Sequence, residues 1–582
     1  MSRPLGRMRK RAFALPLVVG LAATVLTWSG PAGADPDAAA RPGLTEAIET
    51  ILADPRMDGG AASVVVADAA GGEVLYRHEA GDRLMPASNT KLVTSAAAAE
   101  LLGTDYRFTT EALAAGRQQG SVLRGDLYLR GSGDPTALAS DYRKLAAEVA
   151  DRGVRTVTGE LVADDTRFDD QRLGRSWAAD DESSYYSAQI SALTVAPDTD
   201  YDSGTVIVEV SPGAAAGDRP RVALTPRTGY VEIVNEAETL PAGQEGTLTV
   251  ERRHGTNKIV VSGGIAAGDG PVKEWATVWE PTGYAADVFR QALEDEGVRV
   301  VGKTRLGRQA PDSARELAVH RSMPLKELLV PFMKLSNNMH AEALTKAIGY
   351  ERSGSGTWSA GLAAISGYLK QAGVDSSRLR QVDGSGLSRM NNFPAAQLVE
   401  LLLSVRDEPW YADWARSLPV ACDPDRFVGG TLRSRMCGTP AALNARAKTG
   451  SLTGASALSG YVVDKDGREL VYAIVLNNYL ASSVKSIEDA IVVTLASSDG
   501  SGAEAVLPLK KRALEERSDI ECSWSKAKAC CPLWGGGPGM GPPARRGKPL
   551  PSAGPACRRR RVFPGVGGPA ALPPVVPMSG NR

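Results

Sequence analysis

Ser88 and Lys91 lie three residues apart at the start of a predicted helix. Residues 92–102 follow with alanine and other apolar side chains at helical spacing, and Gly103 can end the helix. Because residues i and i+3 share one face of a helix, the serine hydroxyl can contact the lysine amine. A serine in a first helical turn also lies beside free backbone N–H groups, which stabilise an oxyanion. The pair can therefore act as a nucleophile with its base. The alternative is that Ser88 only caps the helix and Lys91 is solvated.

Two further short motifs follow much later in the chain. Ser336 and Asn338 form an S-x-N motif on a loop between two predicted helices, and residues 448–450 form a K-T-G motif on a predicted strand. Each of the three motifs is common by itself. Their order and their placement on a helix start, a loop and a strand resemble the penicillin-binding protein and serine β-lactamase superfamily.

The long stretch between the first two motifs narrows this resemblance. The chain resembles the class C low-molecular-mass penicillin-binding proteins, a family of serine-type D-Ala-D-Ala carboxypeptidases and endopeptidases. Residues 125–135, 187–193 and 383–389 match the family as well, and the resemblance runs from about residue 44 to residue 495. It implies an α+β fold, in which a transpeptidase-like domain with an antiparallel sheet covered by helices is interrupted by two mainly β inserted domains.

Changes of pattern along the chain predict the domain boundaries. Helical segments and strands occur in residues 35–109 and 320–498, which we assign to the transpeptidase-like domain. The stretch between them changes to short strand-like runs separated by glycine, proline and aspartate. We divide that stretch into one inserted domain formed by residues 110–185 and 270–319 and a second one formed by residues 186–269.

Both ends of the chain differ from its middle. Residues 1–34 have the basic start, the apolar stretch and the small-residue site at 32–34 of a secretory signal peptide, with cleavage expected after Ala34. The alternative is an uncleaved anchor helix. Residues 499–582 are rich in glycine, proline and arginine without periodicity, which predicts a disordered tail. We expect a secreted, extracytoplasmic protein that is associated with the cell wall and at most peripheral to the membrane.

Composition limits the kinds of partner. The 582 residues carry 67 basic and 67 acidic side chains, so net charge does not indicate a nucleic-acid partner. No cysteine and histidine residues have zinc-site spacing, and we predict no metal and no cofactor. Cys422 and Cys437 flank a short loop, and in an oxidising compartment we expect them to form a disulfide. The alternative is two unpaired thiols. The sequence leaves the oligomeric state open.

The resemblance implies a catalytic role for five residues. Ser88 would attack the carbonyl of the penultimate D-Ala in a peptidoglycan stem peptide and form an acyl-enzyme, and β-lactam antibiotics would acylate the same serine. Lys91 would be the base, and Ser336 would relay a proton between Lys91, Lys448 and the leaving amine. Asn338 would hold the substrate backbone and orient Lys91.

The K-T-G strand would bind the end of the substrate. Lys448 and Thr449 would hold the terminal carboxylate, and Gly450 would leave room for the substrate beside the strand. The backbone N–H groups of Ser88 and Ser451 would form the oxyanion hole.

Three residues of the matched stretch 383–389 are further candidates for substrate binding. Asp383, Ser385 and Arg389 would lie beside the cleft; the alternative for Asp383 and Ser385 is a turn whose N–H groups they satisfy. We expect a preference for a stem peptide whose third side chain ends in an ammonium and a carboxylate, as in meso-diaminopimelate. Arg389 would bind that carboxylate, Asp181 the ammonium, and Tyr186 the aliphatic stem. The alternative is that the acidic stretch at 180–182 is only a solvated loop.

Other functions remain possible on the same scaffold. A β-lactamase, a D-aminopeptidase or an esterase would share the three motifs, and an inactive wall-binding protein would be expected to have lost Ser88, Lys91 or Lys448, all of which are present. Acylation by labelled penicillin separates an active enzyme from an inactive scaffold. Release of D-Ala from a stem-peptide analogue separates the peptidase from the esterase.

Overall fold

The computed structural model describes residues 42–500 and 502–508. The predicted signal peptide lies outside this described part, as does most of the predicted tail. Within it, no helix is long and apolar enough to cross a membrane.

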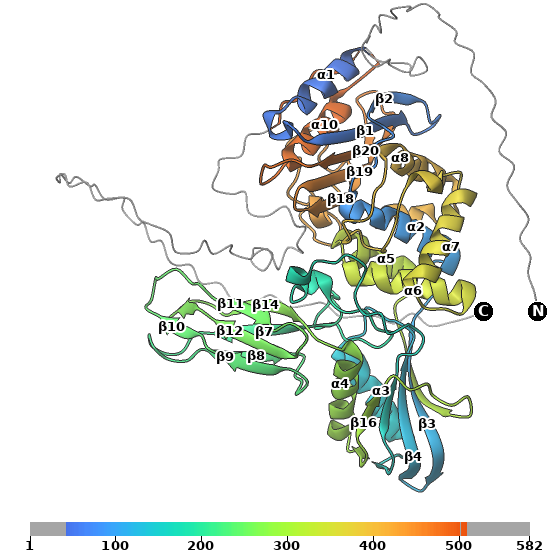
Figure 1. The fold of residues 1–582 in the computed structure, drawn as a ribbon, viewed down its shortest axis with the longest axis vertical. Coiled ribbons are helices and arrows are strands. Elements are labelled where there is room, and N and C mark those ends of the chain that lie inside the picture. Colours follow the sequence, from blue (N-terminus) through green and yellow to red (C-terminus); the bar gives the residue numbers. More distant parts are fainter. Residues whose placement is uncertain (1–41, 501, 509–582) are drawn as a thin grey trace, which may run out of the picture. The chain divides into compact units, whose positions relative to one another are not determined.

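A five-stranded antiparallel sheet organises the part of the chain that carries the motifs (Figure 1). Its order is β18-β19-β20-β1-β2. The hairpin of β1 and β2 near the start of the chain therefore joins the last three strands through the pairing of β1 with β20. This pairing confirms the predicted α+β arrangement, in which one sheet is assembled from both ends of the chain. The strands are β1 (Ala61–Asp68), β2 (Val74–His78), β18 (Arg446–Leu452), β19 (Ala455–Val463) and β20 (Glu469–Asn477).

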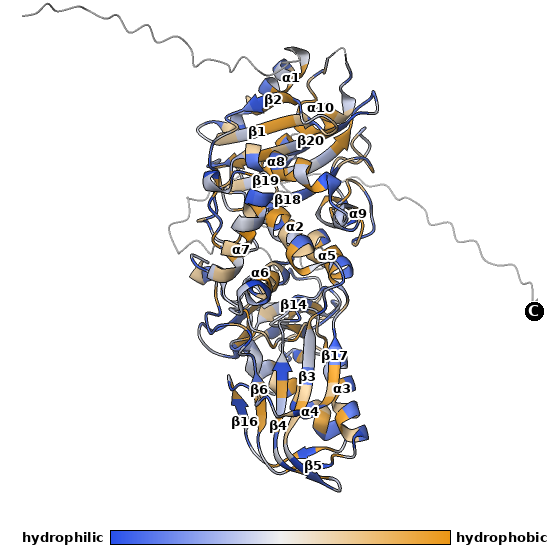
Figure 2. Ribbon diagram, turned by 90° about the vertical axis from the view of Figure 1, so that its right-hand side faces the viewer, coloured by the Kyte–Doolittle hydropathy of each residue, from blue (hydrophilic) through white to orange (hydrophobic). Residues whose placement is uncertain are grey.

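Both faces of this sheet are buried, and successive side chains therefore enter different cores. In β1, Val65 and Ala67 join one hydrophobic cluster while Val64 and Val66 join another. The central strand β20 is correspondingly buried after its first residue and mostly apolar (Figure 2). Helices α1 (Pro42–Leu52) and α10 (Lys485–Ser497) pack on one face, and α8 (Ala395–Ser404) packs on the other.

Helix α2 (Thr90–Leu102) is the centre of the helical layer. Its residues 90–99 are all buried, because neighbouring helices contact it from several sides and the small alanine side chains allow close approach. Ser88 lies in the short helical turn Ala87–Asn89 that leads into α2, so a packed helix fixes the position of this candidate nucleophile. The neighbouring helices are α5 (Leu325–Lys334), α6 (Asn338–Ser353), α7 (Trp358–Gln371) and α9 (Tyr411–Arg416).

The chain between α2 and α5 forms further sheets. A seven-stranded sheet with helices α3 (Ala139–Asp151) and α4 (Pro281–Asp295) is built from two separate stretches of the chain. Its strands are β3 (Thr109–Gln119), β4 (Val122–Gly131), β5 (Thr156–Val157), β6 (Leu161–Asp164), β15 (Arg299–Val300), β16 (Thr304–Leu306) and β17 (Arg315–Arg321).

Three small sheets lie between these two stretches in the sequence. Their last strand, β14, pairs with β7, so residues 272–277 belong with these sheets and the boundary drawn at residue 270 moves past residue 277. The strands are β7 (Thr205–Ser211), β8 (Arg221–Thr225), β9 (Glu232–Asn235), β10 (Glu238–Leu240), β11 (Thr249–Arg252), β12 (Lys258–Ser262), β13 (Gly264–Ala266) and β14 (Val272–Thr277).

Ordered packing continues beyond the point where the tail was predicted to begin. Ala503, Ala505 and Val506 pack against the cluster beneath α10, and the Val506 N–H donates to Thr494 Oγ1 at 3.1 Å. The periodicity of the sequence ends at residue 498, but these small apolar side chains still cover the helix. The rest of the predicted tail lies outside the described residues.

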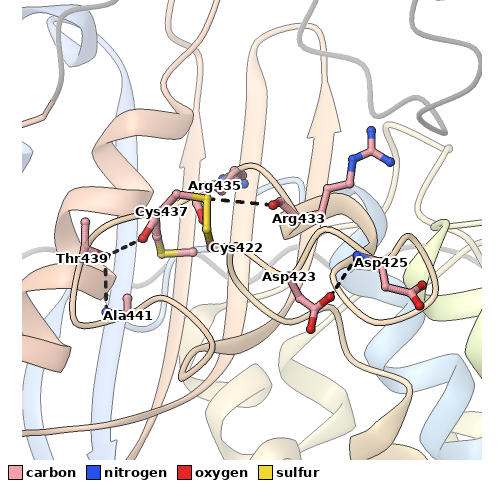
Figure 3. Close-up of a disulfide and its surroundings, with 9 residues drawn as sticks. Cys422, Asp423, Asp425, Arg433, Arg435, Cys437, Thr439 and Ala441 are labelled. Atoms are coloured by element: carbon pink, nitrogen blue, oxygen red, sulfur yellow. Dashed lines mark hydrogen bonds between the residues drawn. A yellow bond between two sulfur atoms is a disulfide. The ribbon is translucent and has the colours of Figure 1, made fainter. Parts of the chain in front are cut away.

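The predicted disulfide between Cys422 and Cys437 is present (Figure 3). It closes a loop whose ends are separated by 15 residues and whose middle forms a short helical turn, Gly430–Leu432. The loop precedes β18, the strand of the K-T-G motif, and its Thr431 hydroxyl lies 2.7 Å from the Thr449 hydroxyl on that strand.

We expect the Cys422→Ala/Cys437→Ala double variant to lose about 3 kcal/mol of unfolding free energy, the value for closing a loop of about 15 residues in the unfolded chain. Denaturant unfolding of the wild type and the variant, both under non-reducing conditions, measures this difference. Removing both cysteines avoids a lone thiol that could pair with cysteines elsewhere in the chain. Equal unfolding midpoints would contradict the expected contribution.

Candidate active site

Ser88 and Lys91 meet at the start of α2. The Lys91 Nζ lies 2.7 Å from Ser88 Oγ, as the spacing of the two residues predicts. Ser88 is half-buried, while Lys91 has no exposed surface. The serine therefore remains accessible at the surface of the site, and its lysine partner is enclosed in the protein.

The Lys91 amine also contacts two carbonyl-type oxygens. Its Nζ lies 2.7 Å from Asn338 Oδ1 and 2.9 Å from the backbone oxygen of Ser385. Both oxygens can only accept hydrogen bonds, whereas the Ser88 hydroxyl can donate as well as accept. In the neutral amine, the two N–H groups therefore point to these oxygens and the lone pair points to the Ser88 hydroxyl.

The amide of Asn338 is oriented by a residue from the insertion. Its Nδ2 donates to the backbone oxygen of Tyr186 at 2.8 Å, so its Oδ1 faces Lys91. The preceding residue, Asn337, caps α6 by accepting from the N–H groups of Met339 and His340. The S-x-N loop is therefore held both by the helix that follows it and by the inserted stretch.

Lys448 connects the K-T-G strand with the S-x-N loop. Its Nζ donates to Ser336 Oγ at 2.8 Å and to the backbone oxygen of Thr449 at 2.9 Å. Ser336 has a φ of 58°, a left-handed conformation that is rare for a residue with a side chain. Such backbone strain is retained where the surroundings require a particular orientation, here that of the Ser336 hydroxyl.

Gly450 allows β18 to lie directly against the turn that carries Ser88. A Cβ atom at Gly450 would lie 2.7 Å from the backbone oxygen of Pro86 and 3.0 Å from the backbone nitrogen of Ser88. We expected this glycine to make room for the substrate beside the strand. In the structure, the missing side chain makes room for the backbone of Pro86 and Ser88.

The hydroxyl of Thr449 lies 2.7 Å from the hydroxyl of Thr431, which belongs to the disulfide loop. Within the described residues, Ser451 Oγ is buried and makes no hydrogen bond. Both residues lie on the edge strand of the sheet, next to the turn that carries Ser88. An edge strand with hydroxyl side chains can pair with an extended peptide and bind its terminal carboxylate.

Asp383 and Ser385 form a turn that is completely buried. Asp383 accepts hydrogen bonds from the N–H groups of Gly386 and Ser388, and Ser385 Oγ accepts one from the Leu387 N–H. These contacts match the alternative in which Asp383 and Ser385 satisfy the N–H groups of a turn. The Ser385 backbone oxygen, which lies 2.9 Å from Lys91 Nζ, is the part of the turn that contacts the candidate base.

An apolar cluster beside Ser88 has charged side chains close to it. Ala87, Leu387, Leu452 and Ala455 form this cluster, and Tyr186 and Trp177 pack against it. The Tyr186 hydroxyl donates to Asp181 Oδ1 at 2.8 Å, and burial raises the pKa of the Asp181 carboxyl against the opposing effects of Tyr186 and the Arg389 charge. Arg389 is exposed and donates to the Thr453 backbone oxygen.

Three residues that contact this site were not identified from the sequence. Trp177 Nε1 donates to Asp383 Oδ2, Thr431 contacts Thr449, and Glu342 accepts the N–H groups of the buried turn. Only Glu342 has a local signal, because it lies four residues after Asn338 on the same face of α6. Among the described residues, no group of three or more histidine, cysteine, aspartate or glutamate side chains could hold a metal ion.

Lys334 holds the disulfide loop against the S-x-N loop. Its Nζ donates to the backbone oxygens of Leu418 and Val428, and its side chain is almost fully buried. Burial, with a smaller effect from the Arg446 charge, lowers the pKa of Lys334 to about 7. The folded protein therefore disfavours the charged amine.

This lowered pKa predicts a pH-dependent stability. Between about pH 7 and the higher pKa of the unfolded chain, the unfolded state binds more protons at Lys334, so its contribution to stability rises with pH and is lost as pH falls toward 7. The unfolding free energy of the wild type relative to Lys334→Met should rise between pH 7 and pH 10 by about 1 kcal/mol or more. Lys465→Met, at an exposed position, is the control. A difference that does not change with pH would contradict the lowered pKa.

Comparisons with known proteins agree with this geometry. A model of the D-Ala-D-Ala carboxypeptidase 3 (S13) family matches residues 44–498. The chain is 46% identical over 526 residues to the D-alanyl-D-alanine carboxypeptidase of Actinomadura sp. (strain R39), over 90% of this chain and 97% of that protein. The crystal structure of penicillin binding protein 4 (dacB) from Haemophilus influenzae has a TM-score of 0.68 and 23% identity, covering 78% of this chain and 99% of that one. Its complex with a novel β-lactam has a TM-score of 0.61 and 22% identity, covering 77% and 96%.

Proposed function

The chain belongs to the D-Ala-D-Ala carboxypeptidase 3 (S13) family and is a D-Ala-D-Ala carboxypeptidase, and we propose that Ser88 is its nucleophile. The observation that carries this proposal is the contact of Ser88 Oγ with Lys91 Nζ at 2.7 Å. Peptidoglycan stem peptides and β-lactams are the partners of such an enzyme. The roles of the individual residues follow from the contacts described above.

Acylation begins with transfer of the Ser88 proton to the lone pair of Lys91. The Ser88 oxygen then attacks the carbonyl carbon of the penultimate D-Ala, and the carbonyl oxygen becomes an oxyanion. The N–H groups of Ser88 and Ser451 stabilise this oxyanion, since the first belongs to the opening turn of a helix and the second to the adjacent edge strand.

Collapse of this intermediate breaks the C–N bond to the terminal D-Ala. The proton taken by Lys91 passes to the leaving amine through the Ser336 hydroxyl, which Lys448 holds by its hydrogen bond. Water then attacks the ester, its proton returns through Lys91, and Ser88 is regenerated with release of the shortened peptide.

The terminal carboxylate of the substrate is bound by the K-T-G strand. Thr449 and Ser451 supply hydroxyl donors on the edge strand, and Lys448 supplies the positive charge. Thr431 fixes the Thr449 hydroxyl through their 2.7 Å contact, so the disulfide loop contributes indirectly to binding.

We expect Ser88→Ala to abolish both D-Ala release from a stem-peptide analogue and covalent labelling by penicillin, because the variant lacks the oxygen that forms the acyl-enzyme. Mass spectrometry of penicillin-treated wild type should find the adduct on Ser88. An adduct on any other residue of the wild type would contradict the proposed nucleophile.

We also propose that the apolar cluster beside Ser88 selects the third side chain of the stem peptide. Tyr186 packs on the cluster and bonds to Asp181, while Arg389 provides an exposed positive charge close enough to act on Asp181. This combination of an apolar surface, an acid and a base is complementary to an aliphatic side chain ending in an ammonium and a carboxylate, as in diaminopimelate.

We expect Asp181→Ala and Arg389→Ala each to lower kcat/KM for a diaminopimelate-type peptide, because each leaves one substrate charge without its partner. The loss should correspond to about 1–3 kcal/mol of activation free energy. Turnover of a peptide with an uncharged third side chain should change little. Asp180→Ala, which removes an adjacent exposed acid, is the matched control. Equal losses on both peptides would show that these residues support the fold and do not recognise the side chain.

We propose, finally, that the enzyme acts outside the cytoplasm. The disulfide is of the kind that persists in oxidising compartments, and the substrate is a component of the cell wall. The signal peptide predicted for residues 1–34 lies outside the described residues and stays a prediction.

A further inference from the structure

We propose that Glu342 is a positioning residue for Lys91, which it orients by fixing the backbone oxygen of Ser385. This inference rests on the proposed role of Lys91 as the base for Ser88. Its effect passes through one turn of backbone, because Glu342 accepts N–H groups of the turn whose Ser385 oxygen contacts Lys91.

The carboxylate of Glu342 holds the two peptide groups next to the contact with Lys91. Its Oε1 accepts the Ser385 N–H at 2.8 Å, and its Oε2 accepts the Gly384 N–H at 2.8 Å. Ser385 also supplies the backbone oxygen that lies 2.9 Å from Lys91 Nζ. The orientation of this oxygen is therefore set by a carboxylate that binds N–H groups on consecutive residues.

The turn has little freedom to take another position. A Cβ atom at Gly384 would lie 2.2 Å from Thr345 Oγ1 and 2.6 Å from the backbone oxygen of Ala341, so the turn packs directly on α6. The Gly384 backbone oxygen accepts a hydrogen bond from Thr94 Oγ1 on α2 at 2.7 Å. Glu342 therefore lies where α6, the turn and α2 meet.

A third donor completes the surroundings of the carboxylate. Trp358 Nε1 on α7 donates to Glu342 Oε2 at 2.7 Å, and the Lys346 ammonium lies 4.0 Å from the centre of the Trp358 ring. Three N–H donors around two oxygens match an ionised carboxylate, which only accepts. A protonated carboxyl would direct its O–H toward one of these donors and lose that hydrogen bond.

The charges around Glu342 come from several elements. Asp383 lies in the turn, Lys346 one helical turn further along α6, and Lys91 on α2 beyond the Ser385 oxygen; Asp169 pairs with Lys346. Burial and the Asp383 charge raise the pKa of Glu342 against the opposing effect of its hydrogen bonds. As pH falls through this raised pKa, Glu342 takes up a proton and its hold on the turn weakens.

The rate of Ser88 acylation by a labelled penicillin, measured from acid to alkaline pH, tests this role. Glu342→Gln keeps the shape but places an NH₂ group against at least one N–H donor, so its acylation rate constant should be about tenfold or more below the wild type at alkaline pH. The ratio of the two rates should shrink as pH falls, because the wild type then loses the same support.

Trp358→Phe is the second variant, and it keeps the aromatic ring beside Lys346. It removes one hydrogen bond to the ionised carboxylate, so the pKa of Glu342 should rise further and the acid loss of activity should begin at higher pH. At alkaline pH its acylation rate should match the wild type within about threefold. Thermal unfolding of each variant shows whether it is folded.

The outcomes separate this inference from the proposed function. A ratio for Glu342→Gln that is constant with pH, or a loss below threefold, would overturn the positioning role while leaving Ser88 as nucleophile. A Trp358→Phe profile that superposes on the wild type would also overturn it, even if Glu342→Gln does not fold. Failure of penicillin to label the wild type would instead contradict the proposed function itself.

Discussion

The candidate site depends on one buried amine, that of Lys91, whose N–H groups must meet acceptors in fixed positions. Lys91 has no exposed surface, and burying an amine is costly unless its N–H groups meet acceptors. Asn338 Oδ1 and the Ser385 backbone oxygen supply such acceptors and leave the Ser88 hydroxyl as the partner that can donate a proton. The same contacts that satisfy the buried lysine therefore allow the lone pair of a neutral amine to face the Ser88 hydroxyl, as the proposed mechanism requires.

Residues from the insertion and from α6 hold these two oxygens in place. Asn338 is oriented by the backbone oxygen of Tyr186, which comes from the stretch inserted between the first and second motifs. The Ser385 oxygen belongs to a turn held by Glu342 and Asp383, two fully buried carboxylates. The inserted stretch therefore completes the hydrogen bonds of Asn338, a candidate catalytic residue.

The sequence predicted the parts of the site that depend on local spacing. The contact of Ser88 with Lys91 follows from i and i+3 on a helix, and the sheet assembled from both chain ends follows from the patterns of its strands. Thr431 and Trp177 were missed because no periodicity links them to their partners. Glu342 shares a helix face with Asn338, but the turn that it binds lies more than forty residues further along the chain. The explanation for Gly450 differed for the same reason, since the approach of β18 to the Ser88 turn is a tertiary contact.

The proton positions around Lys91 are the most direct test of this account, and neutron diffraction from a deuterated crystal at a pH where the enzyme is active would locate them. If Lys91 is the base, we expect two deuterons on its Nζ, directed at Asn338 Oδ1 and the Ser385 oxygen, and the Ser88 deuteron lying between its Oγ and Nζ. Three deuterons on Nζ, with the Ser88 deuteron directed elsewhere, would contradict the claim that Lys91 is poised as the base.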